Sequence, residues 1–198
     1  MTFLLYNSVG DKMKITVGVS NRHIHLTSDD YKVLFGDIPF TKRNDLNQPG
    51  MFASELTVTI KGEKRSIENV RVLGPVRSYT QVEISRTDAF YLGVKPPVRN
   101  SGDLEGASLI TIIGPVGTIT KNAGIIAARH IHVDKKIREE HNLVGIEKVS
   151  VKIPGEKSGV INEVYLKDSD EAYFELHLDT DEANAFLLNQ NDEVEIIL

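Results

Sequence analysis

The sequence predicts a mainly β protein, built as a barrel or a sandwich with only short helices. Many short apolar or alternating runs follow one another closely, and the helical segments between them are brief and too few for a doubly wound α/β sheet. One tetrapeptide, Arg-His-Ile-His, occurs at residues 22–25 and again at residues 129–132. This repeat suggests two related halves, which would place one histidine pair from each half at a shared cleft.

The expected strands begin with Lys14–Val19, which alternates and leads into the first copy of the tetrapeptide. Residues 55–60 and 66–67 are expected to pair as a hairpin around a basic tip at 61–65. The further expected strands are 70–73, 81–85, 108–113, 117–120, 149–153, 159–161, 163–166, 173–178 and 193–198. On the strand 81–85, alternation places Gln81, Glu83 and Ser85 on one face.

Short helices are expected where a capping residue follows a strand. Thr27 and Asp30 form a capping-box pattern, and the helix that follows them should run to about Phe35 and end at Gly36. The other helices should begin at Thr87-Asp88, at Asp134 and at Thr180-Asp181. Residues 37–52 are rich in Pro, Asn and Gly, which predicts a loop or lid.

The composition excludes several classes of protein. The chain has 198 residues, a formal net charge of −5 and no cysteine. An acidic balance argues against bulk nucleic-acid binding, and without cysteine any metal must be held by His, Asp, Glu or substrate atoms. No apolar run is long enough for a membrane span, and the apolar start Met1–Tyr6 lacks the basic region of a secretory signal. We therefore expect a cytoplasmic protein.

The two copies of the tetrapeptide hold four of the six histidines. His-x-His in a strand places both imidazoles on one face, with Cα atoms about 6.5–7 Å apart, a span over which two rings can bind one divalent ion. A single pair would be better explained as two unrelated histidines. Two copies in the same Arg-His-Ile-His context favour metal binding.

Each histidine pair needs further ligands, and the sequence offers Glu83 and His177 on polar strand faces close before helix starts. Taken singly, each is better explained as an ordinary polar strand residue. As a set, the candidates for one ion are His23, His25 and Glu83, and those for a second ion are His130, His132 and His177. Three protein ligands leave a coordination position open, as in catalytic zinc sites, and imidazole suits Zn better than Co, Ni or Fe on ligand type.

Two arginines, Arg71 and Arg77, flank a Gly-Pro turn between expected strands. Arg77 lies close to Glu83 in the sequence and would suit bidentate binding of a phosphate, although a surface arginine explains it equally well. The sequence contains no P-loop, no dinucleotide-binding glycine motif and no nucleophile elbow, and the lack of cysteine excludes a thiol nucleophile.

Several of these segments resemble motifs of the PduL-type phosphate acyltransferases, also named phosphate propanoyltransferases. The resembling segments are 17–26, 45–50, 70–77, 80–88, 98–103, 128–132 and 175–184. They include Val17-Gly-Val-Ser-Asn-Arg-His-Ile-His-Leu26 and Val70-Arg-Val-Leu-Gly-Pro-Val-Arg77. The matches extend over nearly the whole chain, and their combined specificity is high.

The resemblance implies two small β-barrels with short capping α-helices and an active site with two zinc ions at the junction of the barrels. It also implies an interleaved plan. Residues 1–21 and 128–198 would form barrel one, and residues 22–127 would form barrel two, with a two-stranded flap around 37–56.

The resemblance assigns the metal ligands to the same six residues that the pattern selects, namely His23, His25, Glu83, His130, His132 and His177. Arg77 matches the family's phosphate-binding arginine and is the expected catalytic residue. Ser20, Arg71 and Asn184 match positions near the active site, so we expect them to contact substrate.

The implied reaction is acyl-CoA + phosphate ⇌ acyl phosphate + CoA, with a propanoyl or acetyl group. The expected partners are these small molecules, with no nucleic acid or membrane. Formation of a homo-oligomer is left open. Many relatives enter a bacterial microcompartment for propanediol degradation. The short start of this chain leaves open both contact with shell or lumen proteins and a free cytoplasmic role. The alternatives are a zinc-dependent thioester hydrolase and a metal-binding protein without turnover.

Overall fold

The computed structural model describes residues 13–169 and 173–198, and the apolar start at Met1–Tyr6 lies outside them. The chain divides into two compact units. The first comprises Met1–Gly18, His130–His177 and Ala185–Leu198, and the second comprises Val19–Arg129 and Leu178–Asn184. Within the described residues no helix has the length and apolar character needed to cross a bilayer.

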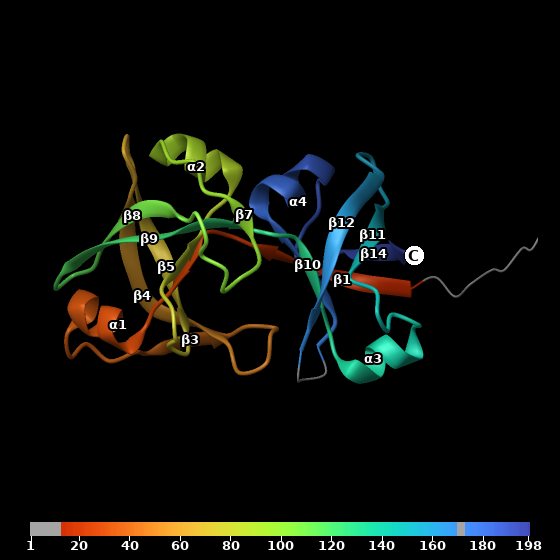
Figure 1. Ribbon diagram of the computed structural model, residues 1–198, viewed down its shortest axis with the longest axis horizontal. Coiled ribbons are helices and arrows are strands. Elements are labelled where there is room, and N and C mark those ends of the chain that lie inside the picture. The colour runs from red at the N-terminus through yellow and green to blue at the C-terminus, as the bar shows by residue number, and fades with distance from the viewer. Residues whose placement is uncertain (1–12, 170–172) are drawn as a thin grey trace, which may run out of the picture. The chain divides into compact units, whose positions relative to one another are not determined.

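Barrel one is a closed ring of six strands in the first unit (Figure 1). In ring order the strands are β1 (Met13–Ser20), β13 (Glu175–Asp179), β10 (His130–Val133), β12 (Gly159–Asp168), β11 (Lys148–Ile153) and β14 (Glu193–Ile197). Their apolar residues alternate inward because successive side chains point to opposite faces of a strand. The buried core includes Val17, Ile131, Val151, Leu176 and Ile196.

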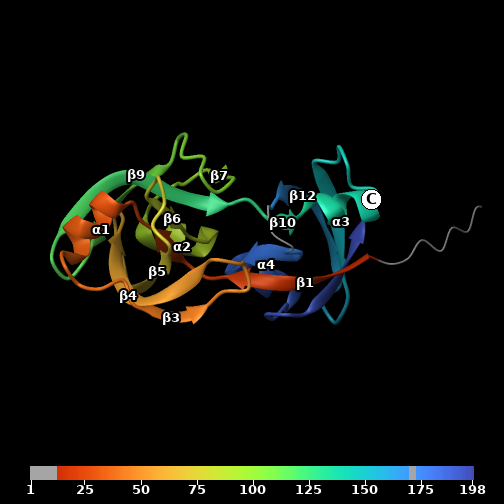
Figure 2. The same ribbon diagram turned by 90° about the horizontal axis from the view of Figure 1, so that it is seen from below.

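Barrel two is a second ring of six strands, in the second unit. In ring order the strands are β4 (Phe52–Lys61), β5 (Ser66–Gly74), β2 (His23–His25), β6 (Gln81–Glu83), β9 (Thr118–Ala127) and β8 (Ser108–Ile113), and β8 pairs again with β4. Figure 2 shows β9 running along the length of this unit. Closure leaves few unpaired strand edges, and the interior is filled mainly by Val, Ile and Leu.

Two short strands lie outside the ring of barrel two. β3 (Lys42–Asp45) pairs with the start of β4, which forms a two-stranded flap within the segment 37–56. β7 (Val98–Arg99) pairs in parallel with the end of β9. The loop expected at residues 37–52 therefore contains a strand, whose four residues are all exposed.

The four helices among the described residues are short and capped. They are α1 (Ser28–Phe35), α2 (Arg86–Leu92), α3 (Lys135–Glu140) and α4 (Thr180–Phe186). Thr27 caps α1 and Asp134 caps α3, as the sequence predicts. The start predicted for α2 at Thr87-Asp88 is wrong. Ser85 is the N-cap and forms a capping box with Asp88, and the strand expected at 81–85 ends at Glu83.

The two barrels share one connection plan. In each, the His-x-His strand lies between a parallel strand (β5 or β12) and an antiparallel strand (β6 or β13). Even a local irregularity recurs: Asn69 in β5 and Glu163 in β12 have positive φ angles of 58° and 59°, and each lies at a shift in strand pairing. The bulge in β12 interrupts the regular pairing without ending the strand. The segments 159–161 and 163–166, which we expected as separate strands, therefore both belong to β12.

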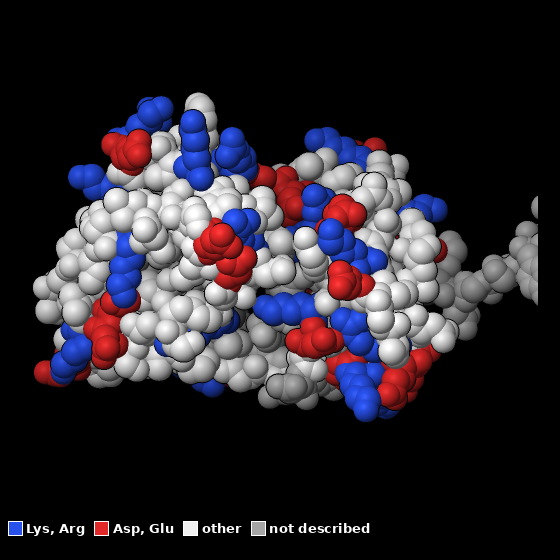
Figure 3. Space-filling view, viewed as in Figure 1, with Lys and Arg blue, Asp and Glu red and all other residues white. Residues whose placement is uncertain are grey.

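Charged side chains are interspersed on the face of each unit shown in Figure 3. Exposed ion pairs include Lys14–Glu193 and Lys148–Glu163. Surface pairs of this kind contribute little to stability, typically about 0–1 kcal/mol. The energetics of the fold therefore rest mainly on the two apolar interiors.

Candidate metal centres

The strands bring the six predicted ligands together as two groups of three. His23, His25 and Glu83 form the barrel-two cluster, and His130, His132 and His177 form the barrel-one cluster. In each group the candidate ligand atoms lie within 4.8 Å of one another. Strand pairing explains the grouping, because His23 lies directly opposite Glu83 and His130 lies directly opposite His177.

The barrel-two cluster combines two buried imidazoles with a carboxylate. His23 Nε2 lies 3.5 Å from Glu83 Oε2, and His23 Nδ1 lies 2.9 Å from the carbonyl oxygen of Asn21. Nδ1 therefore donates to that carbonyl, and Nε2 faces the carboxylate. Burial alone would lower the pKa of His23, but Glu83 and the Asn21 carbonyl outweigh burial and raise it above its ordinary value.

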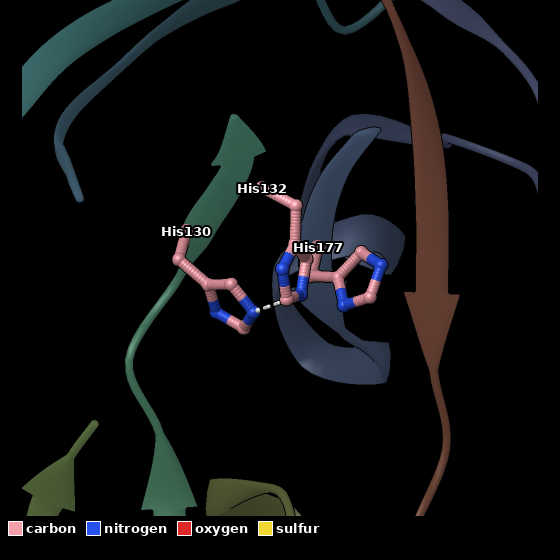
Figure 4. A group of neighbouring side chains, drawn as sticks. All are labelled: His130, His132 and His177. Atoms are coloured by element: carbon pink, nitrogen blue, oxygen red, sulfur yellow. Dashed lines mark hydrogen bonds between the residues drawn. The ribbon is translucent and has the colours of Figure 1, made fainter. Parts of the chain in front are cut away.

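The barrel-one cluster contains three imidazoles (Figure 4). Nε2 of His130 and Nε2 of His132 lie 3.2 Å apart, and the ring centroid of His177 lies 5.1 Å from that of His130 and 4.8 Å from that of His132. Burial, together with the neighbouring His130 and His177, lowers the pKa of His132 to about 3. This ring is therefore neutral at physiological pH, the state that a metal ligand requires.

The two donor sets fit zinc. Each offers three nitrogen or oxygen donors, as two His and one Glu or as three His, and both combinations are those of zinc sites that keep one position for water or substrate. Imidazoles this close together would repel one another if all were protonated. Their proximity therefore favours the neutral form, which binds a metal ion. Three donors per group leave room for a substrate atom.

Arg77 lies next to the barrel-two cluster in a network of polar side chains. Its Nη1 donates to the hydroxyl of Tyr79 at 3.0 Å and to Ser101 Oγ at 3.2 Å. Ser101 Oγ also lies 3.3 Å from Glu83 Oε1, so one hydroxyl connects the arginine to a candidate ligand. The positive charge of Arg77 opposes protonation of His23, as expected for neighbouring groups.

The other three predicted substrate residues lie in different surroundings. Ser20 Oγ lies 3.5 Å from His23 Nδ1, which places Ser20 beside the barrel-two cluster. Arg71 lies opposite His23 on β5, but its Nη1 donates to two carbonyl oxygens of β4 at 3.0 and 2.9 Å. Asn184 is exposed on α4. Ser20 thus adjoins the barrel-two cluster, whereas the contacts of Arg71 are with the backbone.

Comparison with known proteins places the chain in a family. The sequence profile of the phosphate propanoyltransferase family matches residues 16–189. The chain belongs to this family. A phosphate propanoyltransferase of Thermotoga maritima is 50% identical over 196 residues, covering 98% of this chain and 93% of the relative. Enzymes of that name from Rhodopseudomonas palustris and Salmonella typhimurium are 45% and 46% identical over 188 and 177 residues, covering 94% and 86% of this chain and 83% and 82% of each relative.

Family membership makes the protein an acyltransferase, as the resemblance in the sequence implies. The site contains residues that the sequence reasoning did not select. Tyr79 and Ser101 hold Arg77, and Gln81 Nε2 donates to Glu83 Oε1 at 2.6 Å. Alternation along 81–85 already placed Gln81 on the face of Glu83, whereas Ser101 lies in a turn that no local pattern relates to β6.

The arginine of each Arg-His-Ile-His copy has a structural role that the sequence reasoning missed. Arg22 Nε donates to Asp88 Oδ2 at 2.9 Å, and Arg129 Nε lies 3.2 Å from Glu182 Oε1. Asp88 and Glu182 are equivalent, because each lies five residues after the third candidate ligand and closes a capping box. In each copy the arginine therefore ties the His-x-His strand to the helix that follows the third ligand.

Proposed function

We propose that this protein catalyses reversible transfer of a short acyl group, propanoyl or acetyl, between coenzyme A and inorganic phosphate. In the forward direction, a phosphate oxygen forms a bond to the thioester carbonyl carbon and the carbon–sulfur bond breaks, which gives acyl phosphate and CoA thiolate. The observation that carries the proposal is an arginine held beside a metal-type cluster in a chain of the phosphate propanoyltransferase family.

The finer part of the proposal is that each cluster holds one zinc ion and that the two ions act together as a dinuclear centre, at the junction that the resemblance implies. The two donor sets support one ion each, with a position left for substrate. Bound zinc would supply Lewis-acid stabilisation of negative charge on the carbonyl oxygen and on the departing thiolate.

The geometry of Arg77 supports the proposed role in phosphate binding. Nη1 is held by Tyr79 and Ser101, and a guanidinium presents five N–H donors in a planar fork, so the remaining donors can bind phosphate oxygens. A phosphate held in this way beside a bound thioester gains rate from proximity and orientation. We propose direct transfer to phosphate, without a covalent acyl-enzyme. We also propose that Ser20, Arg71 and Asn184 contact substrate.

The proposal also covers the cellular location of the protein and its assembly state. We propose a cytoplasmic enzyme whose partners are acyl-CoA and phosphate. Binding to shell or lumen proteins of a bacterial microcompartment, in propanediol degradation, and formation of a homo-oligomer are the alternatives to a free, single-chain enzyme. Co-purification with shell proteins and light scattering of the purified protein distinguish these arrangements.

The decisive experiment measures release of free thiol from propanoyl-CoA and acetyl-CoA by the purified protein, with and without phosphate. A chelator-treated sample, a sample reloaded with zinc and a determination of zinc per chain accompany it. Thiol release that requires phosphate and is lost on chelation supports acyl transfer at a metal centre. Release without phosphate would instead identify a thioester hydrolase. Tightly bound zinc with no release would identify a metal-binding protein without turnover.

A further inference from the structure

In each barrel, one residue lies two positions before the third candidate ligand on the same strand. It is Gln81 before Glu83 on β6 and Glu175 before His177 on β13. Alternation along a strand places such a residue on the same face as the ligand. Strand pairing sets both opposite the second histidine of the repeat, because His25 pairs with Gln81 and His132 pairs with Glu175. Both are buried, with exposed fractions of 0% and 4%.

Gln81 fixes one oxygen of Glu83. The backbone N–H of Gly102 donates to Gln81 Oε1 at 2.8 Å, which orients the amide so that its NH₂ group faces the opposite way. That NH₂ group donates to Glu83 Oε1 at 2.6 Å and to Ser101 Oγ at 2.9 Å. The other oxygen of Glu83, Oε2, is the one that lies 3.5 Å from His23 Nε2. The amide donor thus engages Oε1 and leaves Oε2 toward the cluster.

Glu175 fixes one nitrogen of His177. Glu175 Oε2 lies 2.9 Å from His177 Nε2, and the hydroxyl of Tyr173 donates to the same oxygen. The Tyr173 hydroxyl also lies 2.8 Å from His177 Nε2, but its hydrogen is donated to Glu175. Because an ionised carboxylate oxygen only accepts, these contacts assign the hydrogen to Nε2 of His177 and the lone pair to Nδ1. Figure 4 shows one ring nitrogen of His177 turned toward His130 and His132 and the other turned away. The carboxylate acceptor thus engages Nε2 and leaves Nδ1 toward the cluster.

The neighbouring strand makes room for this carboxylate. A Cβ atom at Gly18 of β1 would lie 2.5 Å from Glu175 Oε2 and 3.0 Å from the Cδ2 atom of His177. No side chain larger than hydrogen fits there without displacing both groups. Burial of a carboxylate is unfavourable unless its oxygens accept hydrogen bonds, and Tyr173 and His177 supply them. The position of Glu175 is therefore specified by three residues around it, Gly18, Tyr173 and His177.

We propose that residues 81 and 175 are matched positioning residues, each with the polarity opposite to that of the ligand it orients. Glu83 accepts hydrogen bonds, so its partner is an amide donor, and His177 donates one, so its partner is a carboxylate. The proposal rests on the proposed zinc binding. It assigns Oε2 of Glu83 and Nδ1 of His177 as metal-binding atoms, and it makes the pairs 81/83 and 175/177 interchangeable units.

The test compares single and paired substitutions at one cluster at a time. Barrel one is studied with His23→Ala and His25→Ala in place, and barrel two with His130→Ala and His132→Ala. Zinc affinity is measured by competition with a chromophoric chelator, and circular dichroism establishes that each variant is folded. Glu193→Gln, at an exposed residue of β14, is the matched control for Glu175→Gln.

Glu175→Gln should weaken zinc binding by barrel one about 10- to 100-fold, the usual effect of removing a residue that orients a ligand. His177→Glu alone should also weaken it, because two carboxylates then face each other. The pair Glu175→Gln with His177→Glu recreates the arrangement of barrel two and should bind more tightly than either single variant. Gln81→Glu, Glu83→His and their combination should behave in the same way in barrel two.

Nitrogen NMR of the zinc-loaded wild type supplies a readout that does not depend on affinity, because Nδ1 and Nε2 of a coordinated imidazole give distinct signals. Zinc on Nδ1 of His177 is the expected result. Zinc on Nε2, unchanged affinity in Glu175→Gln, or paired variants that bind no better than the singles would overturn the proposal while leaving zinc binding intact. Loss of zinc binding already in the parents with one intact cluster would instead overturn the proposed metal centre.

Discussion

The two barrels have the same strand order, the same bulge and the same arginine–acid tie, but their candidate metal sites differ in charge. The barrel-two cluster has a carboxylate among its three donors, whereas the barrel-one cluster has three imidazoles and a carboxylate one hydrogen bond away. The third ligand and the residue two positions before it thus include one carboxylate in each barrel, at position 83 in barrel two and at position 175, the equivalent of 81, in barrel one. The strand order, the bulge and the arginine–acid tie are therefore the same in both barrels, and the position of one carboxylate on the strand differs.

Two barrels with the same strand order can therefore carry two unlike metal sites. An ion held by three neutral imidazoles keeps more of its positive charge than one that is also bound to a carboxylate, so it polarises a substrate atom more strongly. In barrel two, Glu83 would reduce the effective positive charge of the proposed ion. We infer that the two proposed ions are suited to different substrate atoms.

The largest expected effect comes from removing a histidine of the barrel-one cluster. His132→Ala should lose one of the two proposed zinc equivalents and reduce kcat more than about 1000-fold, because several kcal/mol of charge stabilisation are lost. Metal analysis and phosphate-dependent thiol release measure both. His141→Ala, at an exposed residue of the same unit, should change neither. Full activity in a His132→Ala protein that lacks the ion would refute the metal mechanism.

Arg77 belongs to barrel two alone, and its removal tests the proposed phosphate site. Arg77→Ala should raise KM for phosphate and lower kcat/KM about 100-fold, since charge-assisted hydrogen bonds contribute roughly 1.5–3 kcal/mol each. Arg77→Lys should have a kcat/KM between those of the wild type and Arg77→Ala, because an ammonium keeps the charge without the planar fork. Initial rates over a range of phosphate concentrations provide the measurement. An unchanged phosphate dependence would remove Arg77 from this role.

An ion pair between the exposed Lys121 and the buried Asp30 should make the stability of barrel two depend on pH in the acid range. Asp30 Oδ2 accepts from Lys121 Nζ at 2.6 Å and from Thr80. Burial alone would raise the pKa of Asp30, but Lys121 and Thr80 outweigh burial and hold it below its ordinary value. The stabilisation is therefore fully present above the unfolded-state pKa of about 3.9 and is lost as pH falls through the folded-state pKa.

Asp30→Asn should lower the free energy of unfolding by about 1–3 kcal/mol near pH 7, since it removes the buried carboxylate that accepts hydrogen bonds from Lys121 and Thr80. The difference from the wild type should shrink as the pH falls below about 4. Urea unfolding at several pH values measures this, with Asp29→Asn at the exposed neighbour as control. A difference that does not change with pH would show that the charge of Asp30 is unimportant.

The smallest expected effects concern the two arginine ties. Arg22→Gln and Arg129→Gln should each lower stability by about 1 kcal/mol, which corresponds to roughly 2–4 °C in Tm for a chain of this size. Arg22→Gln should have the larger effect, because the side chain of Asp88 is 7% exposed and that of Glu182 is 25% exposed. Thermal unfolding of both variants gives the ranking. Equal effects would show that burial of the acid does not matter here.

Local features of the fold were predictable from the sequence. The alternation of Lys14–Val19, the cap at Thr27 and the stop at Gly36 each depend on neighbouring residues, and each appears in the structure. The mainly β class followed from the same signals, and the resemblance supplied the two barrels. The six candidate ligands were grouped correctly because a repeat carries information that a single histidine pair lacks.

Features that depend on distant residues were not predictable from pattern alone. Parallel pairing of β2 with β5 leaves no local signal, so the position of Arg71 opposite His23 could not be read from the sequence. Ser101 reaches Arg77 from a turn far along the chain. Ser85 looked like a strand residue because alternation continues through it, although its hydroxyl caps α2. Alternation along β13 puts Glu175 on the same face as His177, but no local signal indicates that the carboxylate of Glu175 is buried.

The closure of barrel one by β1 has a consequence for synthesis on the ribosome. Lys14 pairs with Glu195, so β1 must wait for the last strand of its ring, whereas the strands of barrel two all lie between residues 23 and 127. At about 5–20 residues per second, the 181 residues that follow Lys14 up to and including Glu195 take roughly 9–36 s to translate. During that interval β1 is a nascent apolar strand with an unpaired backbone, which makes it a natural binding segment for a chaperone.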